Sequence, residues 1–466
     1  MIENAYSRMR QRIHSFFESE LIRRIIKNTG YLFGATGISA ALSMVQGILA
    51  ARLLGVAQFG ILGAITVFTS VINKFASFRI NELVVKYVGE FTEDGDPDRA
   101  AAVFKVAALT EIVASFVAFG LIWLLAPFGA RYLVKDPGLA QWFVIYGLIV
   151  LTNLIQESSL GLLQIFNYFN RIAIINVVQS VITLLLVILV YVNDGGLLGI
   201  ILAYMGGKIV GALGVTSMAL LVATRRWGRG WWLTPLGLLS SRARELGYFA
   251  VNTYISGTLS LVTKDSELLW VSFFRSPVET GYYKLALALA NLVQMPVSPM
   301  PQATYPELSR EVAHKNWRNV RYVLRQGSLL AGGYTLFATL VLVLFGRFLI
   351  QYIYTPEFTP AYPALLILLA GFLVANTFYW NRVALLAIGR PDFPTKVNLV
   401  LAVLKIICII VLVPIYGYLA SAALLAGSYI LGVSVSVLKF RSEISKKEHL
   451  SGSGMPKVEV PANGDG

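Results

Sequence analysis

The segment Arg52-Leu-Leu-Gly-Val-Ala-Gln-Phe-Gly60 aligns with Phe273-Phe-Arg-Ser-Pro-Val-Glu-Thr-Gly281 when the chain is laid on itself with a shift of about 221 to 222 residues. Gly60 then falls on Gly281. The same shift brings identical residues together further along: Leu163, Asn176, Val178, Gly195 and Leu202 fall on Leu385, Asn398, Val400, Gly417 and Leu424. A duplicated set of membrane helices is typical of a transporter with two related halves around one pathway.

The composition indicates a lipid environment. Hydrophobic residues make up 56% of the 466 residues and charged residues 14%, and the mean hydropathy is +0.67. Soluble domains carry about 25% charged residues, so a chain this apolar cannot shield its surface from water. The net charge is +14, and the basic residues lie mainly between the apolar windows. We therefore expect membrane lipids, and no nucleic acid, among its partners.

The apolar windows predict an all-α polytopic membrane protein with about twelve spans, because backbone polar groups in lipid must pair within a helix. The spans predicted in the first half are Thr29–Ala51, Phe59–Phe78, Ala101–Leu125, Leu139–Leu163, Ile172–Val192 and Leu197–Ala223. Those of the second half are Leu246–Phe273, Tyr282–Ala303, Gly327–Ile350, Tyr362–Ile388, Val397–Val413 and Tyr418–Leu438. Residues 29–223 and 246–438 then form two pseudo-symmetric lobes of six helices each.

The basic residues predict the orientation. With the N-terminus inside, most of them lie in inside segments, and the outside loops hold only Arg52, Arg131, Lys135, Arg275 and Arg347. This asymmetry predicts an inner or plasma membrane protein with both termini cytoplasmic. Three cytoplasmic segments complete the chain: an amphipathic stretch over 1–28, an Arg/Trp-rich linker over 224–245, and a tail over 439–466 whose composition predicts disorder.

Several ionisable residues fall inside predicted spans, where a charge is costly and usually faces a cavity or a partner. The basic ones are Lys74, Lys208, Lys264, Lys284, Arg382 and Lys405, and the acidic ones are Glu111, Glu157, Asp265 and Glu267. Because basic residues are the larger group, we expect a central cavity that attracts an anion such as a diphosphate. The alternatives are snorkelling to the interface for Lys74, Arg79, Lys284 and Arg382, and a purely structural hydrogen-bonding role for Asp265.

Neither a metal site nor a cofactor is expected. The only cysteine, Cys408, lies in an apolar window, and the three histidines are far apart. Gly207-Lys208 is followed by Ile209, so it is not a phosphate-binding loop. Any active transport would therefore be secondary, with H⁺ or Na⁺ coupled through Asp265, Glu267 or Glu111.

Motifs beside the repeat junctions resemble a known family. They are Ala51-Arg52-x-Leu54-Gly55-x-x-x-Phe59-Gly60, Asp265 with the apolar run to Phe274 and Gly281-Tyr282-Tyr283-x-x-Ala286, Pro306-x-Leu308-Ser309, and Gly389-Arg390. In order and spacing, from about Asn28 to Phe440, the chain is similar to the polysaccharide-transporter branch (Wzx-type oligosaccharide flippases) of the multidrug/oligosaccharidyl-lipid/polysaccharide exporter superfamily.

The resemblance implies a MATE-like V-shaped bundle that works by alternating access. It also implies a substrate, a polyprenyl-diphosphate-linked oligosaccharide of the O-antigen or exopolysaccharide type, and a polysaccharide polymerase and glycosyltransferases as partners. From charge we expect six residues to contact the diphosphate: Arg52, Lys74, Lys264, Arg275, Lys284 and Lys405.

Three other function classes remain open, one of them a purely structural scaffold, in which isolated intramembrane charges would have no evident purpose. A cation-coupled multidrug antiporter would need an acidic cavity, and the first predicted span, Thr29–Ala51, has no acidic residue. A membrane glycosyltransferase or ligase would need a sizeable outer loop or catalytic carboxylates, whereas the longest predicted outer loops, 126–138 and 351–361, are short. We therefore expect a protein that moves its substrate without making or breaking covalent bonds.

Overall fold

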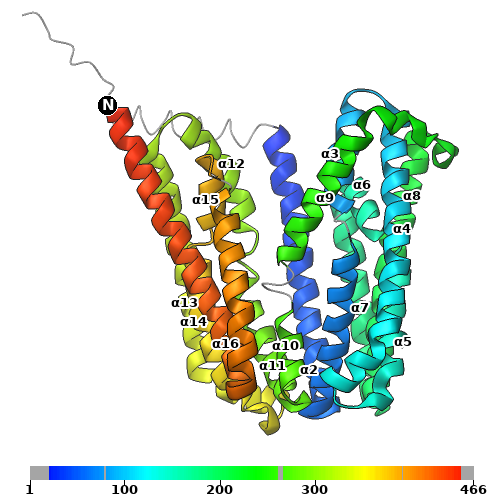
Figure 1. The fold of residues 1–466 in the computed structure, drawn as a ribbon, viewed down its shortest axis with the longest axis vertical. Helices are drawn as coiled ribbons and strands as arrows, with labels where there is room; N and C mark the ends of the chain where they lie inside the picture. The colour runs from blue at the N-terminus through cyan, green and yellow to red at the C-terminus, as the bar shows by residue number, and fades with distance from the viewer. Residues whose placement is uncertain (1–19, 78–79, 261–265, 391, 453–466) are drawn as a thin grey trace, which may run out of the picture. The chain divides into compact units, whose positions relative to one another are not determined.

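The computed structural model describes residues 20–77, 80–260, 266–390 and 392–452, and every regular element in these ranges is helical (Figure 1). The first elements are α2 (Glu20–Ala76), α3 (Ile80–Glu93), α4 (Pro97–Phe128), η1 (Gly129–Leu133), η2 (Pro137–Leu139), α5 (Ala140–Thr152), α6 (Gln156–Ile165), α7 (Phe169–Val192) and α8 (Gly196–Trp227). They are followed by η3 (Trp231–Leu233), η4 (Leu236–Arg242), α9 (Ala243–Ser260), α10 (Glu267–Phe274) and α11 (Pro277–Gln294). The last elements are α12 (Met300–Ala313), α13 (Trp317–Leu349), η6 (Ile350–Tyr354), η7 (Pro356–Phe358), α14 (Ala361–Thr377), α15 (Asn381–Ala387) and α16 (Asp392–Gly452).

The long apolar windows form long helices. Within the described ranges, 8 helical segments are long and apolar enough to cross a membrane. Two of them contain two predicted spans each, joined at a glycine with positive φ: Gly55 (φ 63) in α2 and Gly417 (φ 64) in α16. An L side chain disfavours this conformation, so glycine permits the sharp change of direction. The predicted all-α polytopic fold is confirmed.

The seventh predicted span is described only in part, and the eighth ends earlier than predicted. Residues 261–265 of the seventh, which include Lys264 and Asp265, lie outside the described residues, and α9 and α10 flank them. The eighth span is α11, which ends at Gln294, just before Pro296. The prolines after it remove backbone donors, so the chain passes through turns before α12 begins.

The fourth and tenth predicted spans are broken, which the sequence analysis did not predict. In the fourth, α5 ends at Thr152 and α6 begins at Gln156. In the tenth, α14 ends at Thr377 and α15 begins at Asn381. A broken membrane helix exposes backbone groups that other parts of the protein must satisfy, so these breaks are places where polar chemistry can gather.

The predicted repeat is visible in local structure. Asp96 caps α4 by accepting from the Arg99 N–H, and Asn316 caps α13 by accepting from the Asn319 N–H. Both helices continue into a π-helical turn, η1 or η6, and then a short 3-10 turn, η2 or η7. Backbone with positive φ also recurs at equivalent positions of the repeat: Asn167 follows the broken fourth span, and Gly389 follows the broken tenth span. These paired irregularities show that the two halves share one backbone plan.

The chain forms two compact units. The first comprises Met1–Gly281 and Ile353–Glu357, and the second comprises Tyr282–Tyr352 and Phe358–Gly466. The first therefore extends past the linker at 224–245, where the sequence analysis placed the lobe boundary. It does so because α10 packs on α2 and η1, and the Ser272 hydroxyl donates to the Leu133 carbonyl oxygen at 2.9 Å.

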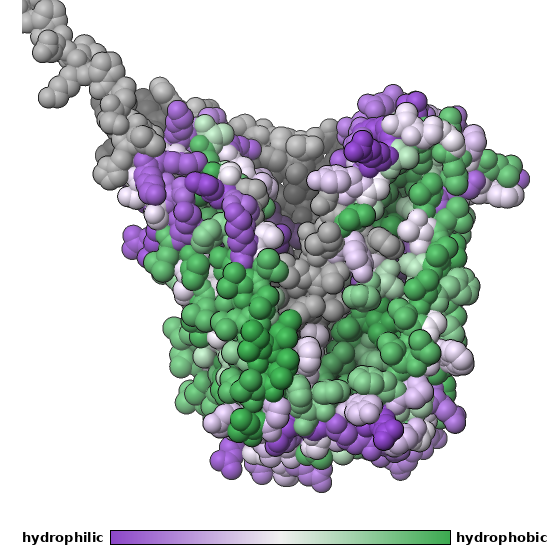
Figure 2. All heavy atoms as spheres, in the orientation of Figure 1, coloured by the Kyte–Doolittle hydropathy of each residue, from purple (hydrophilic) through white to green (hydrophobic). Residues whose placement is uncertain are grey.

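Each unit presents an apolar band between polar ends (Figure 2). Large apolar side chains on the outer helices are exposed, for example Leu189 on α7 and Leu344 on α13. Such exposure is expected where hydrocarbon replaces water. Inside the units, one core surrounds Tyr87, Phe104 and Leu162, and another surrounds Trp380 and Phe440.

The C-terminal segment corrects one expectation. Residues 439–452, predicted as part of a disordered tail, continue α16 to Gly452. Ion pairs hold this extension: Glu443 pairs with Lys439 at 2.8 Å and with Arg390 at 3.4 Å. The Lys447 ammonium also donates to the Ile388 carbonyl oxygen at 3.0 Å. The later residues, 453–466, lie outside the described part of the chain.

Candidate functional site

A buried carboxylate closes the break in the fourth predicted span. Glu111, on α4, accepts hydrogen bonds from the backbone N–H of Glu157 at 2.7 Å and of Ser158 at 2.9 Å. It also accepts from the Ser158 hydroxyl at 2.7 Å. These N–H groups belong to the first turn of α6, where helical backbone donors have no partner within the helix. Glu111 therefore caps a helix that begins inside the first unit.

A small polar pocket lies beside this carboxylate. Its volume is about 270 Å³, and its lining includes Glu111, Asn73, Ser77, Asn153 and Gln156. Glu111 is only 7% exposed. Desolvation opposes its negative charge, while the three donors and the positive end of α6 stabilise it. Such a carboxylate, next to a space lined by amide oxygens, can exchange a proton or a small cation.

The broken tenth span shows that the backbone plan does not require this carboxylate. Aligning the two capped helices places Ala331 and Gly332 where Glu111 lies in the first half. At that break, the Trp380 indole N–H donates to the Ser328 hydroxyl at 2.6 Å. Since a similar break forms without an acidic residue at the aligned position, the capping carboxylate is specific to the first half.

Two exposed lysines lie on neighbouring helices of the same unit. Lys74 is near the end of α2 and Lys208 is in the middle of α8, and these two helices pack against each other. In sequence, Lys74 is flanked by Asn73 and Ser77, which line the Glu111 pocket. The structure thus places two cations from distant parts of the sequence on contacting helices.

The two arginines predicted near the outer mouth have protein partners. The Arg52 Nε donates to the carbonyl oxygens of Ile353 at 2.7 Å and Tyr354 at 3.1 Å. Arg275 binds the Glu279 carboxylate through Nε and Nη2, each at 2.8 Å. Arg52 therefore fastens α2 to the end of η6, and Arg275 braces the start of α11.

The remaining predicted site residues are spread over the chain. In the second unit, Lys405 on α16 is 5% exposed and Lys284 on α11 is half-buried. In the first unit, Glu267 is 2% exposed and lies in the first turn of α10, where a negative charge is favoured. Lys264 and Asp265 lie outside the described residues. A diphosphate site formed by all six predicted cations therefore stays a prediction.

Part of the candidate site could not be recognised from the sequence. Lys208 was noted as an intramembrane cation, but the contact of its helix with that of Lys74 depends on how α2 and α8 pack. A signal for the broken fourth span was present, because Asn153, Gln156 and Glu157 interrupt an otherwise apolar window. A cluster of polar residues in the middle of a membrane span can mark a break.

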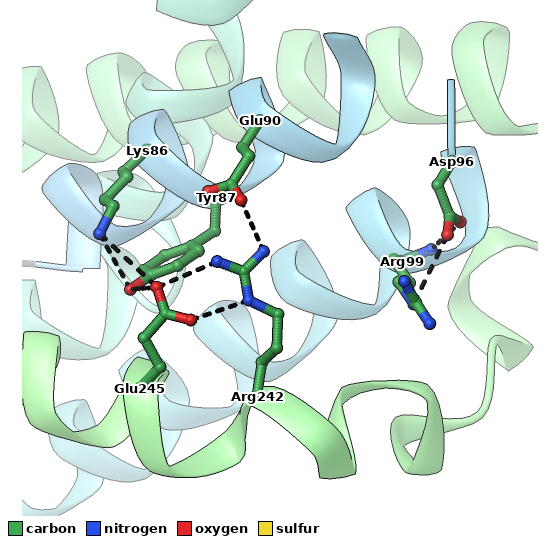
Figure 3. A network of polar contacts seen from close by, with 7 residues as sticks. All are labelled: Lys86, Tyr87, Glu90, Asp96, Arg99, Arg242 and Glu245. Carbon is green, nitrogen blue, oxygen red and sulfur yellow. Dashed lines mark hydrogen bonds and ion pairs between the residues drawn. The ribbon is translucent and has the colours of Figure 1, made fainter. Parts of the chain in front are cut away.

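A polar network fastens the linker before α9 to α3 (Figure 3). Arg242 donates to Glu90 at 2.6 Å and to both oxygens of Glu245, at 2.8 and 3.0 Å. The buried Tyr87 donates to Glu245 at 3.1 Å, and Lys86 donates to the Tyr87 hydroxyl at 3.1 Å. The hydrogen bond from Arg242, with that from Tyr87, holds the pKa of Glu245 below its ordinary value against the effect of burial.

Comparisons with known proteins give the family and the fold. The family model described as Polysaccharide biosynthesis protein matches residues 25–312, and the model described as MatE matches residues 267–411. The inner membrane protein YghQ of Escherichia coli (strain K12) is 22% identical over 365 residues, covering 75% of this chain and 98% of that protein.

Solved structures with the same fold include an inward-facing multidrug resistance MATE family transporter of the MOP superfamily, with a TM-score of 0.70 and 15% identity, covering 89% of this chain and 96% of that one. The lipid II flippase MurJ, in an inward closed conformation, has a TM-score of 0.67 and 15% identity, and the match covers 92% of this chain and 94% of that one. A MOP superfamily transporter from Pyrococcus furiosus is described as having a binding pocket of reverse polarity. Its TM-score is 0.64 at 14% identity, and the match covers 91% of this chain and 96% of that one.

Proposed function

Because the chain belongs to the Polysaccharide biosynthesis protein family, and with it to the MOP superfamily of membrane transporters, we propose that it flips a polyprenyl-diphosphate-linked oligosaccharide across the membrane. The substrate is taken up at the cytoplasmic leaflet and delivered to the outer one by alternating access. The sugar-diphosphate head passes through a hydrated cationic cavity, while the polyprenyl tail stays in lipid. No covalent bond is made or broken.

The match of residues 25–312 to the Polysaccharide biosynthesis protein family model is the observation that carries this proposal. Within that range, Lys74 and Lys208 lie on contacting helices, α2 and α8, and are our first candidates for contacts with the diphosphate. A diphosphate offers several oxygens and at least two negative charges, so it can accept hydrogen bonds from both ammonium groups. Arg52, Lys264, Arg275, Lys284 and Lys405 stay proposed as further contacts along the path.

We assign the coupling of transport to Glu111. The carboxylate faces a pocket large enough for water or a small cation, at the start of a half-helix. Binding H⁺ or Na⁺ there would change the hydrogen bonds that join α4 to α6. The membrane potential adds about 2.3 kcal/mol per charge per 100 mV, which favours movement of an anion toward a positive outside.

The test is leaflet-resolved transport of a polyprenyl-diphosphate sugar in liposomes that contain the purified protein. Lys74→Gln/Lys208→Gln should abolish transport without loss of the folded protein. The matched control is Lys396→Gln, which removes an exposed lysine whose ion pair with Asp392 lies on the surface. Transport that is unchanged in the double variant would reject these two lysines as the binding site, and absence of transport by the native protein would reject the substrate.

A second candidate is a cation-coupled antiporter of small organic cations, which the buried Glu111 and its polar pocket favour. In that case a cationic dye would be driven across the same liposomes by an ion gradient. Neutralising Lys74 and Lys208 would then leave transport intact or raise it, because the two lysines repel cations. The sign of this effect separates the two candidates.

A further inference from the structure

A second pocket lies entirely within the second unit, at the break in the tenth predicted span. Its volume is about 600 Å³, and it lies between the first turns of α13, the turn joining α14 and α15, and the last part of α16. Trp380 and Phe440 form part of an apolar wall, with ring centroids 5.4 Å apart. The bond from the Trp380 indole to Ser328 holds this wall in place.

Three arginines line this pocket, whose other lining residues are mostly apolar: Arg321, Arg325 and Arg441. Arg321 and Arg325 are four residues apart on α13, so they lie on one face of that helix. Arg441 comes from α16. Within the described part of the chain, Arg325 and Arg441 make no ion pair. Glu443, the carboxylate nearest in sequence to Arg441, is already paired with Lys439 and Arg390. The pocket therefore presents positive charge from two walls.

The pocket also opens toward the surface that faces lipid. Leu329, one of its lining residues, is 60% exposed, and Phe337 and Leu344, further along α13, are 68% and 72% exposed. Figure 2 shows hydrophilic side chains at this end of the unit next to its apolar band. An acyl chain could follow the exposed face of α13 while a phosphate group remains near the arginines.

We propose that this pocket binds an anionic phospholipid, with its phosphate between Arg325 and Arg441 and one acyl chain along α13. Basic pockets between membrane helices near an interface suit such headgroups. The site lies in one unit and at one end of its spans, the end that the basic residues predict to be cytoplasmic. It is therefore suited to a resident lipid of that leaflet rather than to a substrate that crosses the bilayer. The proposal does not depend on the transported substrate.

The experiment titrates delipidated full-length protein with phosphatidylglycerol or phosphatidylcholine and counts bound lipids by native mass spectrometry. Phosphatidylglycerol should bind more tightly than phosphatidylcholine. Arg325→Gln/Arg441→Gln should weaken phosphatidylglycerol binding roughly thirtyfold, since two basic contacts to an anionic lipid are lost. Arg318→Gln is the matched control, because Arg318 is an exposed arginine on α13 that does not line the pocket.

A second variant keeps the test decisive if the double variant does not fold. Leu329→Trp narrows the mouth at an exposed position, leaves the charges in place, and should also weaken phosphatidylglycerol binding. Equal binding of the two lipids by the native protein would overturn the proposal, as would undiminished binding of phosphatidylglycerol by the folded variants. Displacement of phosphatidylglycerol by an equal concentration of a polyprenyl diphosphate would instead assign the pocket to the substrate and reject a resident lipid.

Discussion

Gly60 lies directly against Gly281: a Cβ atom placed on Gly60 would come within 2.7 Å of the Gly281 backbone nitrogen. It would also overlap the Pro277 carbonyl oxygen, and a Cβ on Gly281 would overlap the Val56 carbonyl oxygen. These two glycines occupy equivalent positions in the sequence repeat. In the first unit, therefore, the matched positions of the repeat meet where α2 crosses the first turn of α11.

Substituting Gly60→Ala should destabilise the protein. The added methyl group meets backbone atoms, which cannot move aside as a side chain can, so we expect a loss of about 1 to 3 kcal/mol or more. Gly47→Ala, also on α2, is the control, because nothing lies within 4 Å of its Cβ position. That change should be neutral or slightly stabilising, by up to about 1 kcal/mol. Thermal unfolding in detergent measures both, and equal midpoints for the two variants would contradict the close crossing.

Glu111→Ala should destabilise the first unit by about 1 to 3 kcal/mol, because buried donors of Glu157 and Ser158 lose their acceptor. Ser158→Ala should cost less, about 0.5 to 1.5 kcal/mol, since it removes only the hydroxyl hydrogen bond. Chemical unfolding in micelles measures the difference. A larger loss in Ser158→Ala than in Glu111→Ala would argue against the capping role.

Glu111→Gln addresses the coupling role. The amide keeps the size of the side chain and one acceptor oxygen but can neither take up a proton nor balance a cation. We expect transport driven by an ion gradient to fall to the level of passive exchange, while exchange itself continues. Glu157→Gln, which changes a less buried carboxylate at the same pocket, serves as the control. Full gradient-driven transport by Glu111→Gln would remove Glu111 from the coupling mechanism.

Lys74 and Lys208 should couple in transport. Either Lys74→Gln or Lys208→Gln should raise the KM for the diphosphate substrate roughly tenfold or more, because a charged hydrogen-bond donor is lost. A double-mutant cycle on KM measures the coupling, and strictly additive effects would show that the two lysines act separately.

The Glu245 network should make the linker sensitive to acid. The folded pKa of Glu245 is lowered, so its contribution to stability is fully present above the ordinary glutamate pKa and is lost as the pH falls through the folded value. Hydrogen exchange at the start of α9 should therefore accelerate in acid. Glu245→Gln should exchange faster at neutral pH and show a weaker acid dependence. A steep acid transition that persists in this variant would assign the effect to another group.

The apolar windows were sufficient to predict most of the long helices, and the aligned residues of the two halves predicted the repeat. Lipid leaves the backbone no partner outside its own helix, so a long apolar window predicts its own structure with little help from its neighbours. Gly55 and Gly417 were visible as repeat or motif residues, and both allow turns between predicted spans. The breaks at 153–155 and 378–380 were missed, because a hydropathy average spreads a few polar residues over the whole window.

The candidate site was only partly predictable for a different reason. A sequence shows that Glu111, Lys74 and Lys208 are ionisable and lie in apolar windows, and this was enough to select them. It does not show that Glu111 meets the first turn of α6, or that Arg52 is engaged by the carbonyl groups of Ile353 and Tyr354. Those relationships join residues far apart in the chain. Hydropathy thus determined which segments form long apolar helices, while helix packing alone decided which ionisable groups meet, because electrostatic and hydrogen-bonding partners depend on distances of a few ångströms.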